Sequence, residues 1–305
     1  MLFRSVYFLS SADEQNSAWE SRNKGLNIAE VHRGVDYDAN NNLIIAGTQD
    51  NGVIGQSTAS TLADWKALPN ATGDGNTVAI DDSKSGASDW FYIGNNLGDF
   101  FKATNTGGTL GTATPVALGN GAGGSGLDPA TDGKKEGYDP YPIAISEVDP
   151  QLMMIGGEHL YESTNQGRVV HDLSAGPSGV ISGAGIRVSA IALGRYAAAK
   201  KAAYVFFWNQ PWVRTDAAVW SSRSAPGFRM IQAVETDPEN WQTAIAVDGA
   251  AVWLTIDGGS HWQDITGSLT GNGNPFRSVS NILAVEIIRT RLGLDRKSTR
   301  LNSSH

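Results

Sequence analysis

Short apolar runs alternate with polar turns along most of the chain. Clear examples are LIIAG at 43–47, WFYIG at 90–94, LMMIG at 152–156 and WQTAI at 241–245. Runs of this length, rich in β-branched and aromatic residues and bounded by Gly, Asn, Asp and Pro, predict strands. One alanine-rich stretch, 195–203, has a helix-like composition, and we expect it to be an insertion between two strands. The pattern therefore predicts an all-β protein.

A turn motif recurs behind many of these runs. The clearest copy, TIDGGSHW at 255–262, stands between two strand-like runs. Weaker copies lie at 163–170 and 103–107, and degenerate copies close at Trp65 and Trp19. Successive copies begin 34 to 60 residues apart, and two further strand-like runs precede most of them. Each unit therefore has four short strands, here called A to D in chain order, with the motif as the C–D turn.

Units of four strands with a period of about 40–50 residues are typical of β-propeller blades. We predict a β-propeller of four-stranded blades, with about five complete blades and partial blades at both ends. The predicted blades cover 31–70, 76–118, 141–176, 186–230 and 231–270, within a propeller segment at 6–294. A β-sandwich and a parallel β-helix are the competing folds, and a β-helix needs shorter and more regular repeats.

Composition narrows the classes of function. Of 305 residues, 36 are Gly and none is Cys, which excludes disulfides, thiolate metal sites and cysteine nucleophiles but does not fix the compartment. The formal net charge of −8 and the lack of a basic stripe disfavour nucleic acid as a partner. No uninterrupted apolar stretch reaches 18 residues, so the sequence predicts no membrane span.

Both ends of the chain look foreign to the fold. Residues 295–305 (DRKSTRLNSSH) resemble the translation of a sequencing adapter, and residues 1–5 (MLFRS) resemble the opposite adapter end. Such segments are excluded from fold reasoning. We expect them to make no packed contacts with the propeller, and we expect 6–294 to be an internal piece of a longer protein.

The motif at 255–262 resembles the Asp-box, or BNR repeat, with His261 where that family usually has Thr. The runs AGTQDNG at 46–52 and GDGNTVAID at 73–81 resemble Asp-box propellers of the sortilin (VPS10) and xyloglucanase-like glycoside hydrolase group. This resemblance implies a secreted or cell-surface protein, bacterial in origin, that recognises a glycan or protein ligand. It equally admits a glycoside hydrolase with two carboxylates, and a surface repeat with a purely structural role. The Arg-Ile-Pro motif of sialidases is absent from this sequence.

The motif residues themselves are predicted to stabilise turns. A turn Asp accepts backbone hydrogen bonds, Gly permits a positive φ, and Trp covers the apolar edge of the turn. We assign this structural role to Asp257, Gly259, Trp262, Asn165, Gly167, Asn105, Gly107, Trp19 and Trp65.

A ligand is expected at the other face of the propeller, where the B–C and D–A loops lie on a rigid scaffold. These loops are rich in carboxylates, amides and aromatic rings, which are groups that hold sugars. The candidate ligand-binding residues are Asp50, Asn51, Asp74, Asn76, Asn95, Asp99, Trp208 and Trp212. Asp50 and Asp74 are the candidate catalytic pair, since inverting glycosidases use two carboxyls about 6.5–9.5 Å apart. Turn capping is the alternative role for both.

The sequence predicts no cofactor. The acidic segment around Asp128, Asp132 and Asp139 could supply oxygen ligands to Ca²⁺, but it lacks the EF-hand spacing and includes Lys134 and Lys135.

Overall fold

The structure is a computed structural model. It describes residues 7–9, 19–21, 31–38, 40–41, 43–49, 51–57, 65–71, 75, 77–81, 83, 86–93, 100–106, 109–115, 141–174, 187–267 and 282–287. The two adapter-like ends lie outside these residues, as does the candidate Ca²⁺ segment.

Within this described part, strands make up every regular element except one short 3-10 turn, η1 (Ala197–Ala199). The protein is all-β, as predicted. The turn η1 lies between β16 (Val188–Leu193) and β17 (Ala203–Phe207), where the alanine-rich insertion was expected. None of the described segments forms a helix with the length and apolar character needed to cross a membrane.

Five antiparallel sheets follow one another along the described chain, after a hairpin of β1 (Tyr7–Leu9) and β2 (Trp19–Ser21). Hydrogen-bonded neighbours are consecutive in sequence, so the sheets are meanders, except that β10 and β11 both pair with β9. The first sheet contains β3 (Val31–Asp38), β4 (Leu43–Thr48), β5 (Gly52–Ser57) and β6 (Lys66–Ala67). The second contains β7 (Val78–Asp81), β8 (Ala87–Ile93), β9 (Phe100–Thr106), β10 (Thr109–Leu110) and β11 (Thr114–Pro115).

The other three sheets have four strands each. The third contains β12 (Ile143–Ile145), β13 (Met153–Gly156), β14 (Leu160–Ser163) and β15 (His171–Asp172). The fourth contains β16, β17, β18 (Gln210–Arg214) and β19 (Trp220–Ser222). The fifth contains β20 (Ala233–Thr236), β21 (Ala244–Val247), β22 (Val252–Thr255) and β23 (Gln263–Asp264). The exact boundaries of the blades stay a prediction.

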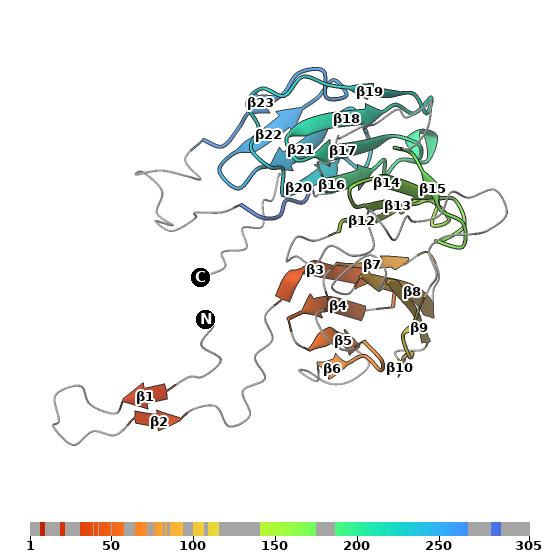
Figure 1. Cartoon of the computed structure of the whole chain (residues 1–305), viewed down its shortest axis with the longest axis vertical. Coiled ribbons are helices and arrows are strands. Elements are labelled where there is room, and N and C mark those ends of the chain that lie inside the picture. The colour runs from red at the N-terminus through yellow and green to blue at the C-terminus, as the bar shows by residue number, and fades with distance from the viewer. Residues whose placement is uncertain are drawn as a thin grey trace.

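The first strands of the five sheets form an inner row. β3 contacts β7, β7 contacts β12, β12 contacts β16, and β16 contacts β20. In Figure 1 these five strands gather toward the middle of the molecule, where neighbouring sheets meet. Four-stranded sheets that meet at their first strands are the blades of a β-propeller, and the inner row lies along its axis.

The hydrophobic core is divided among the contacts between sheets. In β17 all five residues are buried, and they alternate between two clusters. Tyr204 and Phe206 pack toward the fifth sheet, whereas Ala203, Val205 and Phe207 pack toward the third. Side chains of a strand alternate between the two faces of a sheet, so a strand covered on both faces has an uninterrupted apolar sequence. The run at 152–156 contains another such strand, since Met153 and Ile155 pack in one cluster and Met154 in another.

One backbone hydrogen bond recurs between successive sheets, here called the entry hydrogen bond. The N–H of a residue at the entrance to a new sheet donates to a carbonyl in the B–C turn of the sheet before. It joins Gly75 to Thr48 (2.9 Å), Val188 to Gly157 (2.8 Å), Ile231 to Trp208 (2.9 Å) and Ile282 to Gly249 (2.9 Å). The B–C turns of the first, third, fourth and fifth sheets are therefore held beside the D–A connections that follow them.

The first entry hydrogen bond needs glycine. A Cβ on Gly75 would lie 2.2 Å from the carbonyl oxygen of Gly52, which is backbone and cannot rotate away. We predict that Gly75→Ala destabilises the protein by about 1–3 kcal/mol, the usual range for overpacking. The midpoint of urea unfolding measures this cost.

Gly55→Ala is the matched control in the same sheet. Its Cβ would meet the Cδ1 atom of Leu110 at 2.9 Å, which is the end of a flexible side chain. We expect the control to cost clearly less than Gly75→Ala. Equal midpoints for the two variants would contradict the close approach at the entry hydrogen bond.

Candidate functional site

The B–C turns and D–A connections share one face of the sheets, here called the loop face, because entry hydrogen bonds join them. At the first sheet this bond joins Gly75 to Thr48, which lie one and two residues from Asp74 and Asp50 in the sequence. Asn51 is exposed in this turn, and its Nδ2 donates to the carbonyl of Gln49 at 3.0 Å. The side chains of the remaining candidates on these and the neighbouring loops lie outside the described residues: Asp50, Asp74, Asn76, Asn95 and Asp99.

Trp208 occupies the turn between β17 and β18 at the loop face. Its φ of 59° is unusual for a residue with a Cβ, and its side chain is 47% exposed. The backbone is fixed from both sides, since its N–H donates to Arg187 at 3.2 Å and its carbonyl accepts from Ile231 and from the Ser189 hydroxyl. Strained backbone of this kind persists only where the surroundings hold it. A bulky apolar ring is therefore presented to solvent on a rigid turn.

Polar groups accompany Trp208. The Arg187 guanidinium lies 4.7 Å from the centre of the Tyr141 ring and donates to the Tyr141 hydroxyl at 2.6 Å. Asn209 and Arg229 are exposed in the adjoining loops. Aromatic, amide and guanidinium groups together can stack on a ring and bind hydroxyl or carbonyl oxygens.

Asp248, in the B–C turn of the fifth sheet, is a turn cap. Its buried carboxylate accepts hydrogen bonds from the backbone of Arg229, Ala250 and Ala251 and from the indole N–H of Trp253. These four donors satisfy the carboxylate within the protein. An acidic residue of the loop face is here part of the scaffold.

Trp212 has different surroundings from Trp208. It lies within β18, pairs with Val205 and Ser222, and packs against the apolar cluster between the third and fourth sheets. Trp212 is thus partly buried against the core, and its role in ligand binding stays a prediction.

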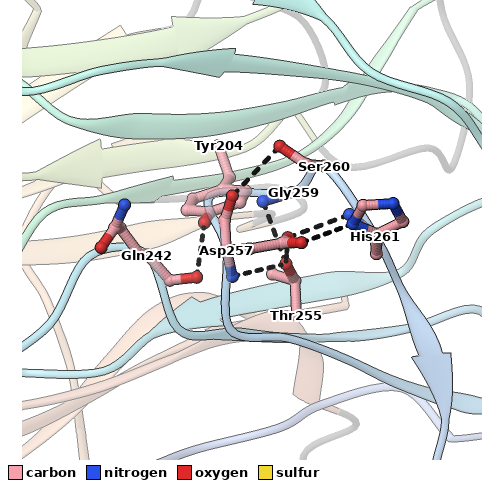
Figure 2. A network of polar contacts seen from close by, with 7 residues as sticks. All are labelled: Tyr204, Gln242, Thr255, Asp257, Gly259, Ser260 and His261. Atoms are coloured by element: carbon pink, nitrogen blue, oxygen red, sulfur yellow. Dashed lines mark hydrogen bonds and ion pairs between the residues drawn. The ribbon is translucent and has the colours of Figure 1, made fainter.

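The turn at 255–262 forms a closed hydrogen-bond network, shown in Figure 2. Asp257 Oδ1 accepts from the backbone of His261 at 2.9 Å and from the Thr255 hydroxyl at 3.0 Å. Asp257 Oδ2 lies 2.6 Å from Nδ1 of His261, and the Thr255 hydroxyl accepts from Gly259 N–H at 3.0 Å. Gly258 and Gly259 both have positive φ. The side-chain oxygens of Thr255, Asp257 and Ser260 thus serve the turn itself.

The same turn also joins two sheets. The buried Trp262 ring packs edge-on against Tyr204 and Phe206 of the fourth sheet and against Phe228. The Tyr204 hydroxyl donates to the carbonyl of Gln242 at 3.4 Å (Figure 2). Asp257, Gly259 and Trp262 therefore occupy positions suited to the structural role proposed for them.

The copy at 163–170 has the same bonds. Asn165 Oδ1 accepts from the backbone of Val169 and from the Ser163 hydroxyl, which in turn accepts from Gly167 N–H. The copy at 103–107 differs. Asn105 is fully buried inside β9, and neither polar atom of its side-chain amide has a hydrogen-bond partner among the residues that the structure describes. Gly107 and the Trp19 side chain lie outside the described residues, and Trp65 is 42% exposed just before β6.

A cavity of about 260 Å³ lies at the axis, and sequence analysis did not identify it. Residues from all five inner strands or the turns after them line it, including Asp36, Glu147, Arg195 and Glu235. Arg195 bridges two carboxylates, with Nε 2.7 Å from Glu147 and Nη1 2.8 Å from Glu235. No group of three or more metal-binding side chains gathers among the residues described. In the sequence, the sign of this cluster is a charged residue at or just after the end of several predicted A strands.

The pKa values of Glu235 and Arg195 in this axial cluster are shifted from their ordinary values. Burial raises the pKa of Glu235 to about 7; Arg195 opposes the rise, and the negative charges of Glu147 and Glu286 add to it. Burial works against the charge of Arg195, but Glu235 and Glu147 outweigh it and raise the pKa of the guanidinium. The positive charge of Arg195 thus neutralises only part of the negative charge of the carboxylates at the axis.

Comparison with known proteins supports the fold and goes no further. No protein-family model and no curated protein matches the chain. Among solved structures, an ancestral GH74 enzyme matches with a TM-score of 0.56 and 15% identity, over 93% of this chain and 40% of that one. The GH74 xyloglucanase from Xanthomonas campestris matches with a TM-score of 0.43 and 16% identity, over 79% of this chain and 46% of that one.

The fold is that of a β-propeller. Both neighbours are GH74 β-propeller enzymes, and the ancestral enzyme is similar enough for the comparison to support this fold. The chain spans less than half the length of either neighbour. At these identities the likeness concerns the fold alone.

Asp257 provides a test of the structural role of the turn. Partial burial opposes its ionisation, but hydrogen bonds from the backbone and ring of His261 and from Thr255 lower its pKa to about 2. We predict that Asp257→Ala costs about 0.5–1.5 kcal/mol at neutral pH. Ligand affinity should not change, since the C–D turn lies at the opposite end of the strands from the loop face.

The pH dependence sharpens this test. A depressed pKa contributes stability above the unfolded pKa of about 3.9, and that contribution is lost as the pH falls toward 2. The difference in unfolding midpoint between wild type and Asp257→Ala should therefore shrink between about pH 5 and pH 2. Asp257→Asn, which keeps an acceptor for His261 N–H, should lose less at neutral pH. An unchanged midpoint for Asp257→Ala would contradict the assignment.

Proposed function

We propose that this chain is part of an exported β-propeller that binds a glycan across its loop face, with Trp208 as a stacking platform. The proposal rests on the exposed indole of Trp208, which is presented by a strained turn. Backbone hydrogen bonds to Arg187 and from Ile231 hold this turn in place. Order at the turn means that little conformational freedom is lost on binding. A protein ligand at the same face is the other outcome of the test below.

The chemistry of the loop face supports a sugar ligand. The apolar faces of sugar rings stack on aromatic side chains, while amide and guanidinium groups such as those of Asn209 and Arg229 donate hydrogen bonds to hydroxyl oxygens. The Asp-box turns, by contrast, use their polar groups internally. Asn209 Nδ2 already donates one hydrogen bond, to the carbonyl of Phe228 at 3.5 Å, and has a second hydrogen to offer. Among the described residues, the loop face therefore offers more exposed aromatic surface than the Asp-box turn at 255–262.

Affinity electrophoresis against a panel of soluble polysaccharides, including xyloglucan, tests this proposal. We expect Trp208→Ala to weaken retention by about tenfold, the equivalent of roughly 1.4 kcal/mol, without a change in melting temperature. Trp65→Ala is the matched control, since Trp65 is similarly exposed but lies just before the outer strand β6. Asp50→Ala and Asp74→Ala should also weaken binding.

Equal retention of Trp208→Ala and wild type would contradict the glycan site at Trp208. The loop face would instead recognise a protein if wild type retained no polysaccharide but captured a protein ligand, and if Trp208→Ala abolished that capture. Binding to neither would favour a structural role.

Glycoside hydrolysis is a second candidate function. Two observations favour it. The fold is like that of an ancestral GH74 enzyme, and the entry hydrogen bond joins Gly75 to Thr48, which lie within two residues of Asp74 and Asp50 in the sequence. An inverting mechanism requires one carboxyl to protonate the leaving group and the other to activate water. The acid needs a raised pKa, which burial or a nearby like charge can supply.

Release of reducing ends from xyloglucan tests hydrolysis separately from binding. Asp50→Asn and Asp74→Asn should each abolish release while retention on the polysaccharide persists. Carboxyl groups more than about 12 Å apart in an experimental structure would rule out this pair as the two catalytic acids.

A further inference from the structure

The axial cavity contains a charge arrangement that neither the Asp-box turns nor the loop face explains. Glu147 follows β12, Arg195 follows β16, and Glu235 lies in β20, so three successive sheets meet in one cluster. Arg195 is the shared partner, with contacts of 2.7 Å to Glu147 and 2.8 Å to Glu235. The side chain of Glu235 is only 27% exposed, whereas that of Glu147 is about half exposed.

All the described charged groups that face Glu235 can be named. Arg195 approaches from β16, Glu147 from the turn after β12, and Glu286 from the segment at 282–287. Asp36 and Tyr37 of β3 line the same cavity, and its wall from β7 is apolar, with Val78, Ala79 and Ile80. Glu235 thus shares one guanidinium with Glu147 and meets the negative charges of both Glu147 and Glu286 when all are ionised. Removing the charge of Glu235, which is more buried than Glu147, relieves both repulsions.

We propose that Glu235 is a proton switch at the propeller axis, whose protonation tightens the contact among the third, fourth and fifth sheets and whose ionisation loosens it. Protonated Glu235 can still hydrogen-bond Arg195, and Arg195 then neutralises Glu147 alone. Ionised Glu235 adds a desolvated negative charge that Arg195 must share. The switch goes beyond the proposed function, because it operates without ligand and at the inner strands.

The direction of the pH dependence follows from the raised pKa of Glu235. The folded protein holds this proton up to about pH 7, whereas the unfolded chain releases it near pH 4.5. The stabilising contribution is therefore fully present below about pH 4.5 and is lost as the pH rises through 7. An ordinary exposed carboxylate would give no dependence near neutral pH.

The test compares the melting temperatures of the full chain and of Glu235→Gln between about pH 5.5 and pH 8.5. Gln mimics the protonated carboxyl, so the two proteins should melt together in acid. Above neutral pH the variant should melt higher by at least about 3 °C. The difference between the two proteins is the observable, because every other titratable group is the same in both.

Three further measurements make the outcome decisive. Asp216→Asn, an equivalent substitution on an exposed turn, should differ from wild type by the same amount at every pH. Glu147→Gln should move the wild-type transition to lower pH, because it removes a like charge and releases Arg195. Hydrogen exchange in β12, β16 and β20, corrected for intrinsic rates, should be slower at about pH 6 than at about pH 8.

A melting difference between wild type and Glu235→Gln that stays constant across the pH range would overturn the proposal. Should Glu235→Gln fail to fold, a carbon-13 titration of the wild-type glutamate carboxyls decides instead. A Glu235 carboxyl that titrates near pH 7 supports the switch, and one that titrates near 4.5 overturns it.

Discussion

Backbone hydrogen bonds made where the chain enters a new sheet tie the second sheet to the first, the fourth to the third and the fifth to the fourth. A fourth bond of this kind ties the segment at 282–287 to the fifth sheet. The donors at four such places are Gly75, Val188, Ile231 and Ile282, which have no side-chain property in common. A backbone bond needs none, because every residue except Pro carries the same N–H donor. At these four places the bond brings a D–A connection onto a B–C turn and so assembles the loop face. Apolar packing between sheets then holds the geometry of that face.

The strands could be predicted because a strand that is buried on both faces has an uninterrupted run of apolar residues in the sequence. In β17, for example, Tyr204 and Val205 face different sheets, so the run contains no polar residue. The Asp-box copies were harder to predict. At 163–170 and 255–262 a hydroxyl and a side-chain oxygen close the turn. At Asn105 the strand continues through the motif, and pairing with Leu110 replaces the turn bonds.

The candidate sites depended on contacts that one-dimensional patterns do not record. Trp208 and Trp212 are four residues apart, yet one is presented to solvent by a strained turn and the other packs between sheets. The axial cluster joins Glu147, Arg195 and Glu235, which belong to three separate sheets. Only the radial arrangement of the inner strands brings such residues together. A charge near the end of an A strand becomes informative once that arrangement is known.

The central claim is that the rigid loop face, and not the Asp-box face, meets the ligand. Hydrogen exchange of the full chain, with and without an oligosaccharide of the polysaccharide that it retains, tests this claim most directly. The account predicts slower exchange in the turn at 207–210 and in the adjoining segment at 229–231, with no change at 255–262. Slower exchange confined to 255–262, with 207–210 unaffected, would contradict it.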